Sequence, residues 1–206
     1  HDIEKVGESE FRNQRPGIVH RLDKDTSGVL ITARNRDAEQ WLQEQFKKRR
    51  VRKEYIAIVL GHPPAKHGSI KTQIIRDSRN RKKFTTSDDP QKGKFAHTVY
   101  YCIGMYGPYS LMRLKLKTGR THQIRVHMKH IGCPILGDPI YGKPDGLFES
   151  AGLMLHARTL GIRLPNEDSF KLFTATVPIR FKKVLKILHE KWEKATFKKL
   201  YNLYEK

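Results

Sequence analysis

The sequence lacks the features that mark membrane and secreted proteins. Its longest apolar runs, such as residues 55–61, have the length of a strand, and none approaches the roughly 20 residues of a membrane span. No apolar signal region stands near His1. Two cysteines, Cys102 and Cys133, are too few for a disulfide framework. These absences favour a reducing compartment, the cytoplasm or the interior of an organelle, with no membrane partner.

Motifs that bind cofactors or build common hydrolases are also missing. The chain has no Gly-x-Gly-x-x-Gly or Walker-type loop, so no nucleotide cofactor is expected. The Gly-x-Ser-x-Gly elbow of a serine hydrolase is absent. Three histidines, His122, His127 and His130, match no usual zinc spacing and lie in a positively charged stretch, so we expect no metal site. A glycosidase would need two close carboxylates, and a chain this basic fits a neutral glycan poorly.

Negative charge is scarce, and its scarcity is uneven. The chain carries 41 Lys and Arg against 21 Asp and Glu, a formal charge of +20. Residues 91–137 contain no carboxylate at all, and two further basic runs occupy 47–53 and 79–83. Such a chain attracts polyanions. No basic amphipathic helix with an apolar face dominates, so nucleic acid is favoured over a membrane surface.

Hydrophobic periodicity predicts an α+β domain in which helices pack on a mixed sheet. Residues 1–14 are expected to be a polar lead-in, and 177–206 a C-terminal helical segment beginning near Pro178. Helices are also expected after an N-cap at Asn35 and near Thr121. The predicted strands cover 28–34, 51–60, 69–75, 95–103, 111–117, 153–164 and 170–176, with the first buried on both faces.

Two clusters of residues could carry chemistry. In residues 20–28, Asp23 and Asp25 stand among cations, which favour an ionised carboxylate able to act as nucleophile or base. The alternative is a loop of surface salt bridges. In residues 118–125, a glycine turn and a helix start meet Arg120 and Arg125, which suits an anion. The alternative there is an ordinary turn with solvated arginines.

These two clusters, with three further blocks, resemble a known family. Residues 15–28 (RPGIVHRLDKDTSG) resemble the active-site motif of the RluA-type RNA pseudouridine synthases. Residues 53–59 resemble that family's Lys-x-Tyr strand, 116–127 its arginine motif, 132–142 the turn that follows, and 155–157 its Leu-His-Ala strand. All five blocks occur in family order. The family's usual upstream strand with a Lys-Pro-x-Gly element, and its small RNA-binding domain, are not visible, so we expect a catalytic domain that lacks the N-terminal portion.

The resemblance implies one catalytic domain over residues 1–206 with the fold of this family, a mixed and largely antiparallel sheet with packed helices and a central cleft. It also implies an enzyme that isomerises uridine to pseudouridine in structured RNA, with ribosomal RNA favoured over transfer RNA and with no cofactor. Asp23 is then the essential carboxylate, which attacks C1′ of the ribose or removes a ribose proton. Arg120 is expected to hold Asp23 ionised through a bidentate pair. The ring of Tyr55 is expected to stack on the uracil and to help take the C5 proton.

The remaining residues of the expected site bind substrate. Leu155 and Ile124 would wall the pocket, although Ile124 fits a helix core equally well. A stacked uridine has to be flipped out, and Arg21, next to His20, would fill the gap that the base leaves. Lys115, Lys117, Arg125 and the run 47–53 would contact phosphates. A monomer is expected.

Two other functions remain open at this point. One is a basic RNA-binding or ribosome-assembly module without activity, although such a protein has little reason to keep Asp23, Tyr55 and Arg120 together. The other is a binder of DNA or of a membrane surface, which would form no uridine-dependent product.

Overall fold

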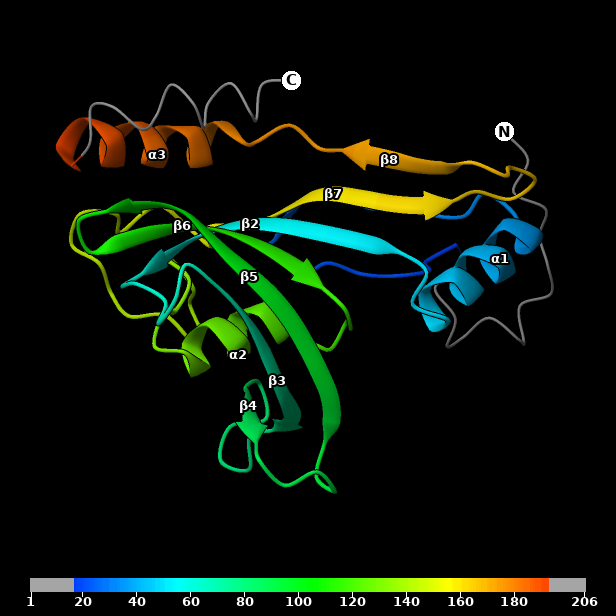
Figure 1. Cartoon of the computed structure of the whole chain (residues 1–206), viewed down its shortest axis with the longest axis horizontal. Helices are drawn as coiled ribbons and strands as arrows, with labels where there is room; N and C mark the ends of the chain where they lie inside the picture. The colour runs from blue at the N-terminus through cyan, green and yellow to red at the C-terminus, as the bar shows by residue number, and fades with distance from the viewer. Residues whose placement is uncertain (1–16, 193–206) are drawn as a thin grey trace.

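The computed structural model describes residues 17–192, which form one continuous sheet with three helices (Figure 1). The strands are ordered β1-β7-β2-β6-β5-β3-β4, and β8 pairs with β7. Every pairing is antiparallel except that of β1 with β7. The predicted class, a mixed and largely antiparallel α+β sheet, is confirmed. The lead-in expected over 1–14 lies outside the described residues, as does the part of the C-terminal segment beyond Trp192.

The eight strands and three helices have the following bounds. The strands are β1 (Ser27–Gly28), β2 (Arg52–Leu60), β3 (His67–Arg76), β4 (Phe84–Ser87), β5 (Lys94–Tyr106), β6 (Tyr109–Leu116), β7 (Leu155–Arg163) and β8 (Phe170–Thr174). The helices are α1 (Arg36–Lys47), α2 (Gln123–His130) and α3 (Ile179–Trp192). Strand β4 was not predicted. The predicted elements occur near their expected ranges, with one exception.

The exception is the buried strand expected over 28–34. Only Ser27–Gly28 forms a strand, Thr32 makes a single bridge to Ile18, and Leu30 is 47% exposed. Gly28 has φ +129°, and a Cβ there would lie 2.3 Å from the carbonyl oxygen of Ala157. Glycine therefore lets the chain cross close to β7 and leave the sheet again, which a continuous strand cannot do.

Two helix ends follow from local sequence. The side chain of Asn35 accepts a hydrogen bond of 2.9 Å from the backbone N–H of Ala38, as an N-cap should. At the end of α2, Gly132 has φ +78° and Cys133 donates its N–H to the carbonyl of Met128, which ends the helix. The predictions of both ends are confirmed.

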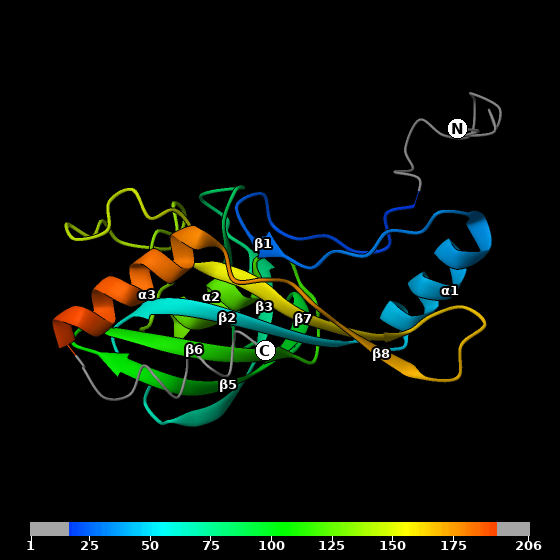
Figure 2. The same ribbon diagram turned by 90° about the horizontal axis from the view of Figure 1, so that it is seen from above.

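The core lies against the central strands β2, β6 and β7. Alternation along β2 sends Tyr55 and Ala57 to one face and Ile56 and Ile58 to the other, and all four are buried. Figure 1 shows α2 below the sheet and α3 above it. In Figure 2, α1 lies at the opposite end of the molecule from α3. The central strands are therefore covered on both faces, and α1 packs through Leu42 against Leu160 and Ile162 of β7.

Candidate active site

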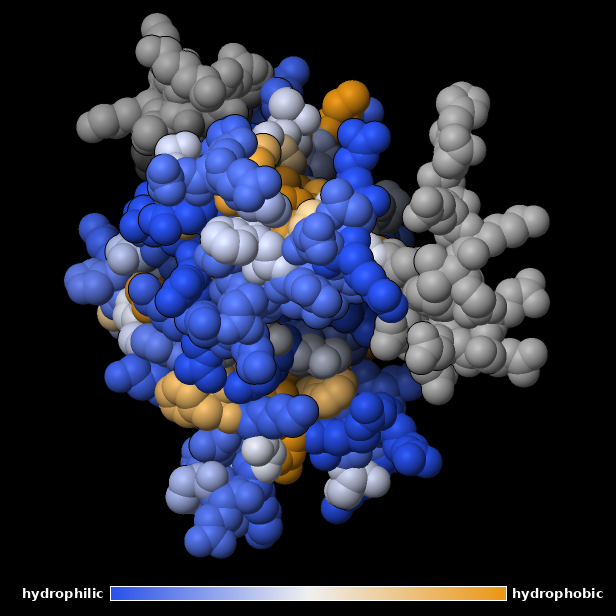
Figure 3. Space-filling view, turned by 90° about the vertical axis from the view of Figure 1, so that its right-hand side faces the viewer, coloured by the Kyte–Doolittle hydropathy of each residue, from blue (hydrophilic) through white to orange (hydrophobic). Residues whose placement is uncertain are grey.

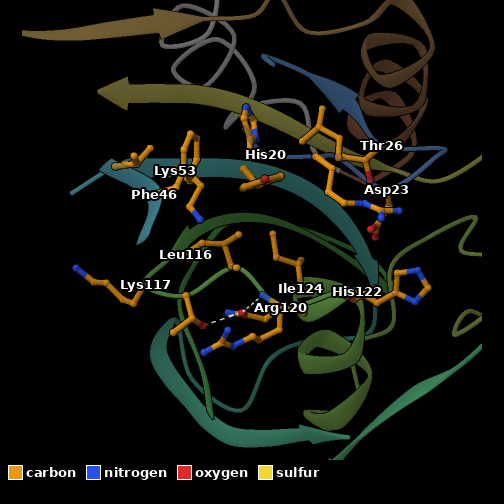
Figure 4. Close-up of a pocket in the computed structure, with 18 of the residues that line it drawn as sticks. His20, Asp23, Thr26, Phe46, Lys53, Leu116, Lys117, Arg120, His122 and Ile124 are labelled. Carbon is orange, nitrogen blue, oxygen red and sulfur yellow. Dashed lines mark hydrogen bonds between the residues drawn. The ribbon is translucent and has the colours of Figure 1, made fainter. Parts of the chain in front are cut away.

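A cavity of about 520 Å³ lies on the face of the sheet that carries Tyr55. Its walls come from segments far apart in the chain: the loop 19–26, the end of α1, strand β2, and the turn 116–125 that enters α2. Figure 4 shows His20, Asp23, Ile124 and Arg120 converging on this space. The expected central cleft therefore has a concrete position, and its volume is in the range of pockets that hold small ligands.

The charge around the cavity is strongly one-sided. Among the residues that line it, all within the described range, only Asp23 carries a carboxylate. Apart from Arg125, the lining cations are Arg21, Lys47, Arg49, Lys53, Lys117 and Arg120. Figure 3 shows that the molecular face at the α1 end is largely hydrophilic. A cavity of this kind favours a polyanionic ligand.

Asp23 is held by Arg125, not by Arg120. Nη1 of Arg125 lies 3.3 Å from Oδ2 of Asp23, and the Arg125 side chain is 4% exposed. The expected bidentate pair between Asp23 and Arg120 is wrong. Arg120 instead donates Nε to the carbonyl of Phe95 at 3.0 Å. The physical reason is helical geometry, because Arg125 lies inside α2 and points back to the loop, while Arg120 lies in the turn before the helix.

Arg125 is itself fixed by a second carboxylate. Its Nε and Nη2 each donate to Asp138 at 2.8 Å, one to each oxygen. Asp138 also accepts the backbone N–H groups of Ile140 and Tyr141. Burial raises the pKa of the Asp138 carboxyl, but these hydrogen bonds and the charge of Arg125 outweigh burial and hold the pKa below its usual value. The result is a fixed row, Asp23–Arg125–Asp138, in which two carboxylates share one buried guanidinium, so the expectation that Arg125 contacts phosphate is wrong.

Asp138 was missed as a functional residue and was read only as part of a turn. A signal was present, because Asp138 is the first carboxylate after the acid-free stretch 91–137. Tyr141 was missed with it: its ring packs against the Arg125 guanidinium at 5.1 Å, and its hydroxyl lies 2.8 Å from Nδ1 of His122. His122 has φ +56°, a conformation that costs energy outside glycine and often accompanies functional sites.

The apolar part of the cavity has the expected residues. Tyr55, on β2, is 9% exposed, and Leu155 and Ile124 are 3% and 4% exposed. All three line the cavity. Burial and the nearby charge of Asp23 raise the pKa of the Tyr55 hydroxyl far above its usual value, so the side chain is a neutral phenol.

The other expected substrate contacts divide into two groups. Arg21, exposed, and Lys117, exposed, line the cavity, as does His20. His20 has a structural task, because its Nε2 accepts the N–H of Ile31 and its ring stacks on Phe46. Lys115 does not line the cavity.

Lys115 is on the opposite face of the sheet. There its Nζ pairs with Glu54 at 3.2 Å and lies 5.5 Å from the ring of Tyr101. The expectation that Lys115 contacts phosphate at this site is therefore wrong, because alternation along β6 turns it away while Leu114 and Leu116 face the cavity side.

Comparison with known proteins identifies the family. A family model described as RNA pseudouridylate synthase matches residues 3–130. The chain belongs to this family. The "Ribosomal large subunit pseudouridine synthase D" of Borreliella burgdorferi is 53% identical over 167 residues, covering 81% of this chain and 50% of that protein. An uncharacterized RNA pseudouridine synthase of Chloroflexus aurantiacus is 44% identical over 177 residues, covering 86% and 55%. The chain thus spans about half the length of these curated pseudouridine synthases.

A solved structure agrees with this membership. The human RNA pseudouridylate synthase domain containing 4 superposes with a TM-score of 0.70 at 28% identity, covering 84% of this chain and 75% of that one. The resemblance to pseudouridine synthases drawn from the five motif blocks is confirmed.

Two absences apply to the part of the chain that the structure describes. In residues 17–192, no three His, Cys, Asp or Glu side chains come together in a way that would hold a metal ion. None of the helices in the same range combines the length and the apolar character needed to cross a bilayer.

Proposed function

We propose that this chain isomerises uridine to pseudouridine in RNA, with ribosomal RNA as the substrate. The single observation that supports this most strongly is the placement of Asp23. It is the one lining carboxylate of a cation-rich cavity, it is held by a buried arginine, and Tyr55, Leu155 and Ile124 lie in the same cavity. The printed name of the Borreliella burgdorferi relative favours large-subunit ribosomal RNA.

The proposed reaction breaks the N1–C1′ bond of uridine and joins C5 of the uracil to C1′. N1 gains a proton and C5 loses one, so atoms and electrons balance without a cofactor. Asp23 starts the reaction, either by attacking C1′ or by removing a ribose proton. The buried Arg125 orients the Asp23 carboxylate through a charge-assisted hydrogen bond. The task that the sequence assigned to Arg120 therefore passes to Arg125.

The remaining cavity residues bind the flipped nucleotide. Tyr55 offers its ring to the uracil, between the apolar walls of Leu155 and Ile124. Arg21 is exposed at the rim, in the same loop as Asp23, and we propose that it fills the gap left in the RNA stack. Lys117 contacts the backbone from the other side of the opening.

We also propose that residues 1–206 act as one catalytic domain, as a monomer in the cytoplasm. Both cysteines in the described range are free, Cys133 is buried, and burial raises the pKa of both thiols, which suits a reducing compartment.

The test is the Asp23→Asn variant. We expect pseudouridine formation in ribosomal RNA to fall by at least about 10³-fold, because the amide can act neither as nucleophile nor as base. RNA affinity should stay within a few fold of that of the unmodified chain. Nucleoside chromatography and a binding titration on the same RNA give the two values. Turnover retained by Asp23→Asn would refute the proposed role of Asp23.

The competing function is an inactive RNA-binding module. It predicts that the unmodified chain forms no pseudouridine in any RNA, while RNA binding remains and weakens steeply with salt.

A further inference from the structure

The end of the cavity away from Asp23 holds two cations and no carboxylate. Lys53, on β2, and Arg120, in the turn before α2, both line the cavity. Burial and the charge of Arg120 lower the pKa of the Lys53 ammonium. Among the described residues, neither side chain forms an ion pair with an acidic group. Figure 4 shows Lys53 above and Arg120 below, with Asp23 at the far side.

The ammonium of Lys53 lies between the turn that precedes α2 and the ring of Phe46. A Cβ added at Gly119 would lie 3.0 Å from Nζ of Lys53, so the ammonium lies directly against the turn that carries Arg120. The ring of Phe46 is 5.9 Å from the same Nζ. The next residue, Glu54, points to the opposite face of the sheet and is taken by Lys115. No acidic neighbour on β2 can therefore reach Lys53.

Arg120 is anchored at only part of its guanidinium. Its Nε donates to the carbonyl of Phe95, and its backbone N–H donates to the Gln123 side chain. These bonds fix the stem of the Arg120 side chain, whose charge is near enough to Lys53 to lower the pKa of that ammonium. Two like charges held close together in a partly buried site repel each other, and an anion placed between them relieves that repulsion.

We propose that Lys53 and Arg120 together form a phosphate subsite for a nucleotide next to the flipped uridine. This inference rests on the proposed function, since a flipped uridine enters the cavity with a phosphodiester on each side. A phosphate is the anion that RNA supplies there, and a guanidinium with an ammonium binds it through charge-assisted hydrogen bonds. Lys47 and Arg49 of the basic run 47–53 also line the cavity, but they are exposed, whereas Lys53 is half-buried.

The test joins a protein variant to a neutralised phosphate. The probe is a short single-stranded 2′-O-methyl RNA with one central uridine among adenosines, in which the phosphate on either side of the uridine is replaced, one at a time, by an uncharged methylphosphonate. We expect one of the two replacements to weaken binding by the unmodified chain about tenfold. Lys53→Gln should bind the fully charged RNA about tenfold more weakly and lose nothing further with that replacement.

The same non-additive result is expected for Arg120→Gln, while Lys186→Gln, which removes an exposed positive charge from α3, should leave the penalty of the replacement intact. Lys53→Arg keeps the positive charge, so the replacement of the phosphate should still weaken its binding to the RNA. Two results would overturn the subsite. In one, either replacement weakens binding by Lys53→Gln as much as it weakens binding by the unmodified chain. In the other, Lys53→Arg is as insensitive to the replacement as Lys53→Gln.

This binding experiment uses no turnover, so its result is independent of the Asp23→Asn test. If the chain forms no pseudouridine but Lys53→Gln loses no further affinity on replacement of the phosphate, the proposed function fails and the phosphate subsite stands. If pseudouridine forms and the penalties add, the subsite fails and the function stands.

Discussion

The two ends of the cavity are built on opposite electrostatic principles. At one end, Asp23, Arg125 and Asp138 form a row in which every charge has a partner, and Arg125 is 4% exposed. At the other end, neither Lys53 nor Arg120 forms an ion pair with a carboxylate of the described residues. The first end is complete before RNA arrives, as a group that starts a reaction should be. The second end lacks its counter-charge, as a group that binds a polyanion should.

The largest expected effect comes from removing Arg125, which both Asp23 and Asp138 contact. Replacing Arg125 with Met leaves Asp138 buried beside Asp23 without a cation, so the free energy of unfolding should fall by about 3–5 kcal/mol. Urea denaturation measures this value. Arg120→Met is the matched control, and it should change stability by less than about 1 kcal/mol because no carboxylate loses a partner. Equal losses for the two arginines would remove the contrast between the ends.

The stability of the fold should decrease with acid in two steps, the first of which comes from buried histidines. Burial, with the charge of Lys53, lowers the pKa of His20 to about 4, and burial lowers that of His127 to about 4. In the unfolded chain these imidazoles bind protons from about pH 6.5 downward. The unfolded state then holds more protons, so stability falls as the pH drops from about 6.5 to about 4.

Asp138 has the depressed pKa of a paired carboxyl, so its contribution is present above about pH 4, the usual range of an aspartate, and is lost as the pH falls further. His20→Asn should therefore reduce the loss of stability between about pH 6.5 and pH 4 in a profile measured by thermal melting, with the share of His127 left, while the loss below about pH 4 remains. A profile that is flat from pH 7 to pH 4 in the unmodified chain would contradict this assignment.

The smallest expected effect is at α1, which borders the cationic end. Asn35→Ala removes the hydrogen bond to Ala38 and should cost about 1 kcal/mol. Since Phe46 and Lys47 at the end of α1 line the cavity, we expect a slightly weaker affinity for RNA, without a change in single-turnover rate at saturating RNA. Asn35→Asp, which can still cap the helix, is the control. A reduced rate in Asn35→Ala would mean that α1 also positions the Asp23 end.

Much of the fold could be predicted because local signals were strong. The strand 51–60 and the helix after Asn35 have clear periodicity and ends, and they occur almost as expected. The segment 28–34 has equally strong β-forming residues, yet the strand β1 is limited to Ser27–Gly28. Gly28 passes β7 closely, and β8 pairs with the rest of that edge of β7. Propensity does not specify which edge of a sheet is already occupied.

The candidate site shows the same division. The motif order predicted Asp23, Tyr55, Leu155 and Ile124, and these side chains do line one cavity. Spacing could not decide between Arg120 and Arg125 as the partner of Asp23, because they lie five residues apart on either side of a helix start. Lys115 was misplaced for a related reason, since the sequence does not tell which face of β6 borders the cavity, and Lys115 lies on the face opposite to Leu114 and Leu116.

The amino-acid sequence by itself determined the family, the positive charge and the carboxylate that we propose to be reactive, because these depend on residue types and on their order. The tertiary structure alone decided which cation holds Asp23 and which cations remain unpaired, because ion pairs form between side chains that are neighbours in space. Arg125 and Asp23 are 102 positions apart in the chain, and only the packing of α2 against the loop brings them to 3.3 Å.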